Sequence, residues 1–432
     1  MRKSGTPLRL ALCVLAALAV LAAVCAAGGS GTALAPIAPE GGRDFVSAEF
    51  TYDQGTRTLR GSMEMTLTNR TGDALDQIVL RAYMNGEDER AVSVSGARIN
   101  GEPAALLADE DDPTVLRAAY SWPEEETVRL TMTVMIRHAK AQRVISLPVL
   151  AMYERGVWRD DAVQMLMEPG YAQPFDFVVE VDGAVAACLR MARDASFALP
   201  CGGALREKEV SGVLLRALAG DAGTARTLLA QAEAALLSLN DAGIAYPYDV
   251  LTIAQSETGR MDGLAYSGLI ALDAQDGGEQ LRRRLTRLIA REVFGIFVES
   301  DPWQQPWLSV SLASCCELLA YRKLKGEAAY ETRFYEEIEP ATRLTRPHGV
   351  CVGAPAAYFG SDSEMTQVLR DQGAWMLLGI EQAIGEEAFI TALSEYVQEN
   401  AGKTATAESL AAALERASGS SWEGYLEDGL RF

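Results

Sequence analysis

Residues 284–321 decide the fold, and they read RLTRLIAREVFGIFVESDPWQQPWLSVSLASCCELLAY. Apolar residues recur at helical spacing in and just before its first half: Leu281, Leu285, Leu288, Ile289, Val293 and Ile296. This spacing predicts a helix with one buried face. Asp301-Pro302-Trp303 should end that helix, because proline cannot continue the hydrogen-bond ladder. Pro306 can then start a second buried helix, since proline is tolerated in the first turn.

The sequence lacks the histidine pair on which many zinc enzymes depend. A catalytic zinc takes about three protein ligands from His, Glu, Asp or Cys, and the HExxH motif places two histidines on one helix face. The sequence contains only His138 and His348, which are far apart. If the alignment is shifted so that Arg291-Glu292 takes the place of "HE", Gly295 falls on the position of the second histidine. This register therefore lacks the histidine pair as well. No CxxC pair is present, so the cysteines do not indicate a zinc site either.

The same stretch resembles the aminopeptidase N-like family of gluzincin zinc peptidases, in which a helix of the form HEIAHQWFYGLVGNDPW precedes REPWLDEGLAEY. Aligned without a gap on DPWQQPWL, the two zinc histidines of the family fall on Arg287 and Arg291. The third zinc ligand, a glutamate, falls on Val310, and the catalytic glutamate falls on Leu288. The resemblance therefore implies a peptidase fold without its zinc ligands and general base, and we predict that no zinc is bound.

Further matches extend this resemblance over residues 45–432, most strongly from Tyr246 on. Tyr246-Pro247-Tyr248 is similar to the "YPY" that opens the family's peptidase domain. Residues 262–273, DGLAYSGLIALD, are similar to the family's cleft-edge strand, "GGMEYPGLILI".

Two more functional positions of the family are replaced in this alignment. The glutamate that binds the substrate's α-amino group falls on Ala265, and the oxyanion tyrosine of "YxKGA" falls on Arg370. Asp262 could substitute for the missing glutamate. A carboxylate in a turn before a strand is, however, more often solvated or a cap.

The sequence predicts an α+β protein with two domains behind an N-terminal membrane anchor. Residues 45–215 alternate between polar and apolar, with turn signals between the runs, which predicts an antiparallel sheet domain. The resemblance implies that this is the family's saddle-shaped N-terminal β domain. It also implies that residues 221–432, which are mainly helical in pattern, form a thermolysin-like peptidase domain.

The N-terminus carries an export signal, because three cations precede an uninterrupted apolar run over residues 10–27. The run is longer than the ~7–15-residue core of a cleaved signal and close to the ~20 residues of a spanning helix. We therefore expect residues 1–27 to be a single-pass anchor and residues 28–44 to be a Gly/Ala/Pro linker. The bulk of the chain would then be extracytoplasmic at the cell membrane.

Two alternatives remain for this N-terminus. A cleaved signal peptide would release the chain as a secreted protein. Lipidation at Cys25 is less favoured, because Val24 stands where a small residue should precede the cysteine. The other cysteines are compatible with export, since Cys188 and Cys201 could form a local disulfide.

A formal net charge of −20 limits the possible partners. Nucleic-acid binding needs basic patches, and a general role at anionic lipid surfaces needs positive charge. The charge therefore argues against nucleic acid and against anionic lipid surfaces as partners. Contact with the membrane is expected only through the anchor at residues 10–27.

Several of the replacements are arginines. Arg287 and Arg291 lie four residues apart, Arg284 extends the same helix face, and the family fold would bring Arg370 toward them across the cleft. Arginine stays protonated and cannot act as a general base, but it can bind a carboxylate or phosphate through two nitrogens. The other interpretation is internal pairing of these arginines. The candidate internal partners are Glu292, Glu299, Asp301 and Asp262.

These observations predict a membrane-tethered aminopeptidase-family protein that is catalytically inactive and binds a peptide or a partner protein in the inherited cleft. One alternative is an active metalloaminopeptidase with non-standard Asp, Glu or Cys ligands. Another is a purely structural role in an envelope complex. Metal content separates the active enzyme from the other two.

Overall fold

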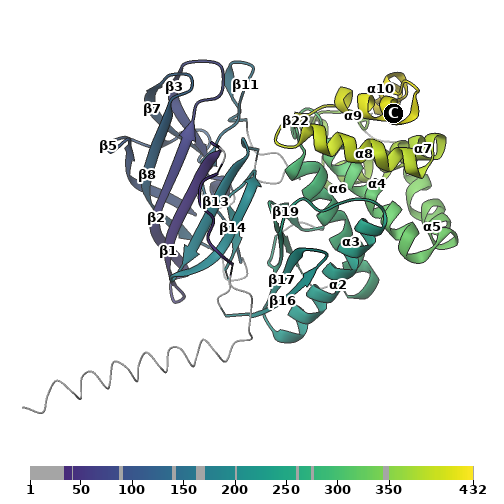
Figure 1. The fold of residues 1–432 in the computed structure, drawn as a ribbon, viewed down its shortest axis with the longest axis horizontal. Coiled ribbons are helices and arrows are strands. Elements are labelled where there is room, and N and C mark those ends of the chain that lie inside the picture. The colour runs from purple at the N-terminus through teal and green to yellow at the C-terminus, as the bar shows by residue number, and fades with distance from the viewer. Residues whose placement is uncertain are drawn as a thin grey trace, which may run out of the picture.

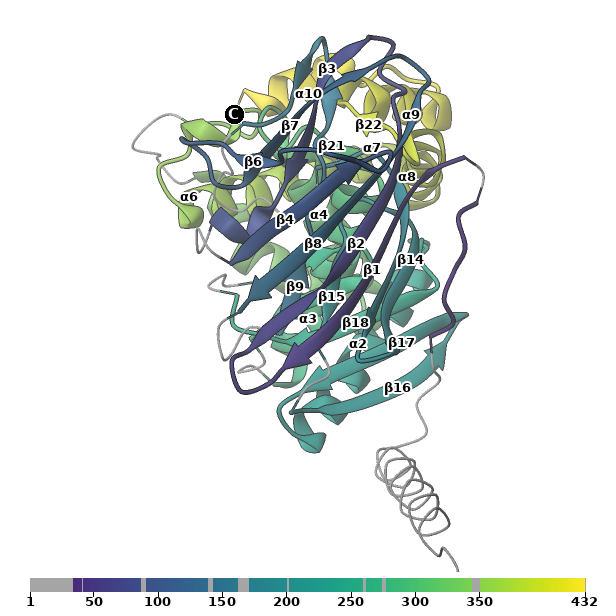
Figure 2. The ribbon, with the colours of Figure 1, turned by 90° about the vertical axis from the view of Figure 1, so that its left-hand side faces the viewer.

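The computed structural model of the protein describes residues 34–40, 42–86, 91–138, 143–161, 171–199, 202–258, 262–273, 277–343 and 350–431. A sheet-rich N-terminal domain stands beside a C-terminal domain made mainly of helices (Figure 1). Turned by 90°, the molecule presents the strands of its large sheet in front and the helices behind them (Figure 2). The predicted α+β architecture is therefore confirmed.

The N-terminal domain is built on a seven-stranded sheet with the order β14-β13-β1-β2-β8-β4-β5. Its strands are β1 (Asp44–Asp53), β2 (Thr58–Thr68), β4 (Val92–Ile99), β5 (Glu102–Pro103), β8 (Thr127–Arg137), β13 (Phe175–Val181) and β14 (Ala184–Ala192). Burial alternates along β2 and β8, as expected for a sheet with one buried face. One pair departs from the predicted antiparallel pattern, because β1 and β13 run parallel. A parallel pair needs a long crossover, which alternation within single strands does not reveal.

A four-stranded sheet with the order β10-β3-β7-β6 shares one hydrophobic core with the large sheet. Its strands are β3 (Leu75–Arg81), β6 (Leu107–Ala108), β7 (Val115–Trp122) and β10 (Val149–Leu150). Two short strand pairs complete this domain: β9 (Val144–Ser146) with β15 (Ser196–Ala198), and β11 (Tyr153–Glu154) with β12 (Val157–Trp158). Trp122, at the end of β7, is one of the largest fully buried side chains in this shared core.

The C-terminal domain begins earlier than the sequence analysis placed it. Its five-stranded sheet has the order β16-β17-β18-β20-β19. The strands are β16 (Ala204–Val210), β17 (Val213–Ala219), β18 (Val250–Gln255), β19 (Leu264–Tyr266) and β20 (Leu269–Leu272). Residues 204–215, assigned above to the first domain, therefore belong to the second. The β16–β17 hairpin alternates between polar and apolar residues like the strands before it. Only the parallel pairing of β17 with β18, which lies beyond a helix in the sequence, shows that the hairpin belongs to the second sheet.

Helices cover this sheet and continue to the end of the described chain. The α-helices are α2 (Ala222–Asp241), α3 (Gly278–Arg291), α4 (Pro306–Lys325), α5 (Glu327–Arg333), α6 (Asp362–Thr366), α7 (Gly373–Ile384), α8 (Glu386–Asn400), α9 (Ala407–Ser418) and α10 (Glu423–Leu430). Three π-helical turns continue α-helices: η2 (Glu292–Phe297), η3 (Phe334–Ile338) and η6 (Gln367–Gln372). The 3-10 turns are η1 (Tyr83–Gly86), η4 (Glu339–Arg343) and η5 (Ala356–Tyr358).

The stretch that opened the sequence analysis forms α3, η2 and α4. Pro306 stands in the first turn of α4, as predicted. The first helix ends at Phe297, four residues before Asp301, because β21 (Glu299–Ser300) leaves it to pair with β22 (Thr404–Ala405). Asp301 instead caps the following turn by accepting hydrogen bonds from the backbone of Trp303 and Gln304 at 2.9 and 3.0 Å.

The predicted anchor, residues 1–27, lies outside the described residues, as does most of the linker predicted for residues 28–44. Within the described part of the chain, no helix combines the length and the hydrophobicity that a membrane crossing requires. Cys201 is also outside that part. Cys188 is a free thiol there, with Sγ 3.2 Å from the carbonyl oxygen of Ala35. The Cys188–Cys201 disulfide stays a prediction.

Candidate functional site

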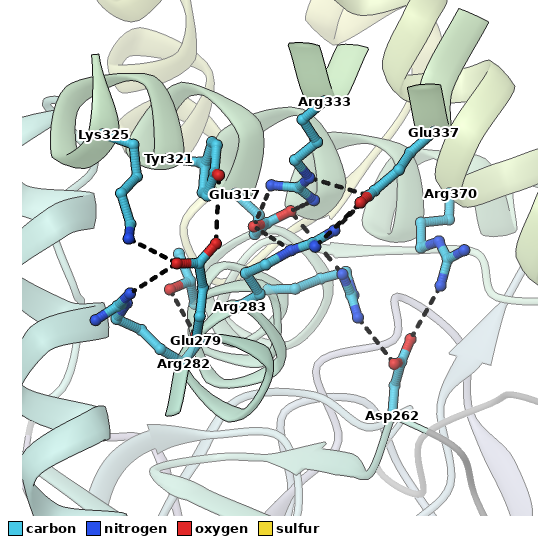
Figure 3. A network of polar contacts seen from close by, with 12 residues as sticks. Asp262, Glu279, Arg282, Arg283, Glu317, Tyr321, Lys325, Arg333, Glu337 and Arg370 are labelled. Carbon is cyan, nitrogen blue, oxygen red and sulfur yellow. Dashed lines mark hydrogen bonds and ion pairs between the residues drawn. The ribbon is translucent and has the colours of Figure 1, made fainter. Parts of the chain in front are cut away.

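A pocket of about 470 Å³ opens between α3 and α4 and is closed on its other sides by residues of α5, η3 and η6. We call it the arginine pocket. Five arginines line it: Arg283, Arg284, Arg287, Arg333 and Arg370. Four carboxylates face them: Asp262, Glu317, Glu337 and Asp371. Figure 3 shows most of these groups pointing toward one another from separate elements.

One face of α3 supplies three of the arginines. Arg287 lies four residues after Arg283 and three residues after Arg284, the spacings of a helix face, while Leu281, Leu285 and Leu288 turn toward the core. Arg284 is buried, and its Nη1 donates to the carbonyl oxygen of Asp273 at 3.5 Å. The arginine face of α3 is thus fixed by the packing of the opposite, apolar face.

Glu317, in the middle of α4, forms the floor of the arginine pocket. Its side chain is only 3% exposed, and Arg333 binds both of its oxygens, at 2.8 and 2.6 Å. Arg283 and Arg287 hold two further guanidinium groups 3.8 and 3.9 Å from the same carboxylate. A buried carboxylate is costly without partners, and these three guanidinium groups are the partners that compensate for the burial of Glu317.

Asp262 connects the two sides of the pocket. Its Oδ1 accepts a hydrogen bond from Nη2 of Arg287 at 2.8 Å, and its Oδ2 lies 3.9 Å from Nη1 of Arg370. Burial raises the pKa of Asp262, but the charges of Arg287 and Arg370 more than offset it, so the pKa lies below its ordinary value. Asp262 is therefore ionised at neutral pH.

Glu337 stands at the rim. Its carboxylate accepts hydrogen bonds from Arg283 at 3.2 Å and from Nε of Arg333 at 3.1 Å. Burial raises the pKa of Glu337, and these two arginines lower it further than burial raises it. A separate group around Glu279, which Figure 3 also shows, ties α3 to the end of α4 through Lys325 and Tyr321.

Close packing between helices brings Arg370 to the pocket. Arg370 lies on η6, and Gly373 directly follows this turn. A Cβ on Gly373 would stand 1.9 Å from Oγ of Ser311 on α4, so only glycine allows this approach. Ser311 in turn donates to the carbonyl oxygen of Leu369 at 2.8 Å. Asp371 then orients the Arg370 guanidinium from its other side, with 2.8 Å between Oδ1 and Nε.

The structure brings together three of the four predicted arginines, Arg284, Arg287 and Arg370. Arg291, one turn further along α3, does not line the arginine pocket, which is therefore displaced toward the start of α3 from the predicted centre. Internal pairing is present, but with partners other than most of those predicted. Asp262 is a partner, whereas Glu292, Glu299 and Asp301 bind elsewhere, to Tyr246, Arg193 and Arg159 respectively.

The remaining predicted positions are apolar and buried. Leu288 is 3% exposed and lies against Gly263, whose Cβ would be 3.2 Å from the Leu288 side chain. Val310 on α4 and Ala265 on β19 are buried as well. Side chains of this kind pack the core and carry no acid–base chemistry.

Sequence reasoning missed Glu317, Glu337 and Asp371, and with them the floor of the site. A signal was present for Glu317, because it is the one charged residue in the apolar run from Trp307 to Tyr321. A lone carboxylate on a buried helix needs a cation nearby. The preceding helix supplies two cations near Glu317, Arg283 and Arg287, while its hydrogen-bonded partner Arg333 comes from a later helix.

Comparisons with known proteins agree with this architecture. Residues 243–427 match the profile of the "Peptidase family M1 domain". A curated relative, Aminopeptidase M1-B of Oryza sativa subsp. japonica, is 28% identical over 165 residues, which make up 38% of this chain and 18% of the rice protein. The chain thus matches less than a fifth of that relative's length.

Solved structures match over much more of the chain. The M1 zinc metallopeptidase from Deinococcus radiodurans has a TM-score of 0.62 at 19% identity, with 90% of this chain and 93% of that chain covered. A mutant of this Deinococcus enzyme, bound to a Tyr-Ser-Ala substrate, has a TM-score of 0.61 at 18% identity, with 90% and 94% covered. A two-domain M1 zinc metallopeptidase mutant bound to L-arginine has a TM-score of 0.64 at 19% identity, with 90% and 93% covered.

These matches define the class: the chain has the two-domain fold of the M1 zinc metallopeptidases. The match of residues 243–427 to the peptidase family M1 domain confirms the resemblance to the aminopeptidase N-like family. The correspondence of single residues with the family's zinc ligands stays a prediction.

The residues that the structure describes do not form a ligand set for the zinc that this fold family implies. Among these described residues, no group of three His, Cys, Asp or Glu side chains is placed to hold a metal ion. Two carboxylates that face Arg287, Asp262 and Glu317, each bind guanidinium groups. The pocket is therefore arranged to bind charged or polar groups through its arginines and carboxylates.

Proposed function

We propose that the protein is a non-hydrolytic, peptide-binding protein with the M1 peptidase fold, and that the arginine pocket is its binding site. The observation that supports this most is the set of five guanidinium groups beside the position where the sequence alignment puts the zinc. Guanidinium groups stay protonated, so they neither coordinate a metal nor take a proton from water. They are strong donors to carboxylate and carbonyl oxygens.

The accessible groups of the pocket are of both signs, as a peptide ligand requires. Asp262 and Glu337 are 33% and 46% exposed, and Arg370 and Arg283 are 31% and 26% exposed. Backbone carbonyl oxygens of a peptide can accept from the arginines, while its N–H groups can donate to the carboxylates. A volume of about 470 Å³ is in the usual range of small-ligand sites.

The neighbouring structures support a peptide as the ligand class. Proteins of the same fold are described with a Tyr-Ser-Ala substrate, with L-arginine and with L-tryptophan bound. We extend to this chain only the binding of such molecules. Cleavage by zinc peptidases uses a metal-bound water, and the carboxylates Asp262 and Glu317 of the arginine pocket are instead paired with guanidinium groups.

The location is also part of this proposal. Residues 10–27 would hold the protein in the cell membrane, with the pocket on the extracytoplasmic side. Carbonate extraction of membranes tests this directly. The protein should remain in the pellet, and its release into the supernatant with a shortened N-terminus would favour signal cleavage and secretion.

Binding of the tripeptide Ala-Ala-Ala to the purified protein, followed by calorimetry, tests the function. We expect saturable binding that Arg370→Ala abolishes and that Arg343→Ala, a surface change at a side chain 73% exposed, leaves intact. The recovered peptide should be uncut. Absence of binding, or an equal loss in both variants, contradicts the proposal. An active metalloaminopeptidase, the alternative, would return free alanine.

A further inference from the structure

The carboxylate of Asp262 occupies the space between two guanidinium groups that come from different elements, Arg287 of α3 and Arg370 of η6. We propose that this space is the binding position for a carboxylate of the ligand, and that Asp262 is an internal competitor which the ligand displaces. This inference rests on the proposed function and specifies its ligand: a peptide that binds through a free carboxylate group.

The charges of the arginine pocket favour one anionic group. Five arginines face four carboxylates, so the lining carries one formal positive charge in excess. When Asp262 is displaced, five arginines face three carboxylates and the excess rises to two, so one ligand carboxylate restores the balance that Asp262 provided. A cation would add to the excess, and an uncharged ligand would leave it uncompensated in a partly buried site.

Exposure distinguishes the replaceable carboxylate from the permanent one. Glu317 is 3% exposed and is held by both terminal nitrogens of Arg333. Asp262 is 33% exposed, and it makes one hydrogen bond to Arg287 and only a long contact of 3.9 Å with Arg370. Displacing Asp262 therefore costs fewer interactions and returns an already accessible carboxylate to water.

Both arginines keep a second carboxylate nearby when Asp262 leaves. Arg287 retains Glu317 at 3.9 Å, and Arg370 retains Asp371, whose Oδ1 lies 2.8 Å from Nε. The guanidinium group of Arg370 is thus held by a hydrogen bond before a ligand arrives, which reduces the entropy lost on binding. Each of the two guanidinium groups still has terminal N–H groups directed to the space that Asp262 now fills. Planar guanidinium groups suit the two oxygens of a carboxylate.

An internal competitor lowers the apparent affinity of a ligand, because the ligand can bind only during the fraction of time in which the competitor is out of the site. Removing the charge of Asp262 should therefore strengthen carboxylate binding, whereas loss of an ordinary binding residue would weaken it. This opposite sign is the distinctive consequence of the proposal. The ligand carboxylate could be the C-terminal α-carboxylate of a peptide or an acidic side chain, and the two sources can be separated with amidated peptides.

Calorimetry with three probes on the full-length protein provides the test: Ala-Ala-Ala as the free acid, Ala-Ala-Ala amide, and Ala-Glu-Ala amide. Asp262→Asn should bind the free acid about tenfold more tightly than the unchanged protein. Asp428→Asn, at an exposed carboxylate on α10, removes the same charge and should change nothing. The plain amide should bind at least about tenfold more weakly than the free acid. Recovery of affinity with Ala-Glu-Ala amide would assign the position to acidic side chains as well.

The failures of the two proposals are distinguishable. If the free acid and the plain amide bind equally, or if Asp262→Asn weakens or does not change binding, the carboxylate position is refuted while peptide binding stands. If none of the probes binds to either protein, the proposed function itself fails. Asp262→Ala provides a second variant without the amide group of asparagine, and its melting temperature shows whether it folds.

Discussion

Arg333 binds Glu317 through both of its terminal nitrogens, at 2.8 and 2.6 Å, and both side chains are almost fully buried. This pair joins α5 to the centre of α4 and forms the floor of the arginine pocket. Glu317→Gln keeps the shape but removes the charge that two further arginines also face. We expect a loss of about 3 kcal/mol in the free energy of unfolding, because breaking a buried pair leaves unpaired charge.

Urea denaturation measures this loss. Glu395→Gln is the matched control, because Glu395 pairs with Arg416 at the surface, where the side chains are 39% and 43% exposed. Such a pair contributes at most about 1 kcal/mol. Equal effects of the two changes would show that the charge of Glu317 is not needed by the surrounding arginines.

A second prediction concerns Glu292, which is fully buried on η2 near the predicted zinc position. One of its oxygens accepts from Tyr246 at 2.6 Å and from the backbone of Gly268 at 3.0 Å, while the other has no hydrogen-bond partner. Burial raises the pKa of Glu292 well above its ordinary value, and nearby Asp194 adds to the effect. The folded state therefore binds more protons than the unfolded state above about pH 4.3.

Stability should accordingly fall as the pH rises from about 4.3 toward the folded-state pKa of Glu292. Glu292→Gln keeps an oxygen for both donors and places an amide N–H₂ where the unpartnered oxygen was. The variant should be more stable than the unchanged protein at pH 7, with a shallower dependence on pH. The slope should not vanish, because burial also raises the pKa values of Asp194 and Glu299. Parallel stability curves for the two proteins from pH 4.5 to 8 would contradict this account.

A third prediction tests how Arg370 is positioned. Gly373→Ala should cost about 1–3 kcal/mol, because its methyl group would collide with Ser311 and push η6 away from α4. The same change should weaken Ala-Ala-Ala binding by moving Arg370. Gly424→Ala in α10 is the control, since a Cβ there meets nothing within 4 Å. Addition of Ser311→Gly to Gly373→Ala should restore binding but not full stability, because Ser311 also donates to the carbonyl oxygen of Leu369 and glycine destabilises a helix interior. A failure to restore binding would assign the effect to something other than this contact.

Local patterns in the sequence were sufficient to predict the two buried helices, α3 and α4. The apolar spacing before Val293 and the proline at 306 predicted α3 and α4 correctly, because both features act within one helix. The resemblance to a family predicted that Arg370 lies near Arg287, although they are 83 residues apart. Periodicity alone could not have shown this.

Features that depend on long-range pairing were missed. The parallel partner of β17 and the parallel pair of β1 with β13 are set by crossovers that no single strand reveals. Glu317 was overlooked because its partner Arg333 comes from a later helix. Arg291 was included in the site because it shares a spacing with Arg287, but the pocket opens one turn earlier along α3.

The most direct test of the central claim is the metal content of the purified protein, measured by mass spectrometry together with the hydrolysis of an aminoacyl-arylamide by the same sample. The arrangement of arginines around Glu317 and Asp262 predicts no stoichiometric zinc and no hydrolysis that EDTA inhibits. One zinc per chain, with turnover that EDTA abolishes, would contradict the account. It would also show that the metal is held by residues other than those placed here.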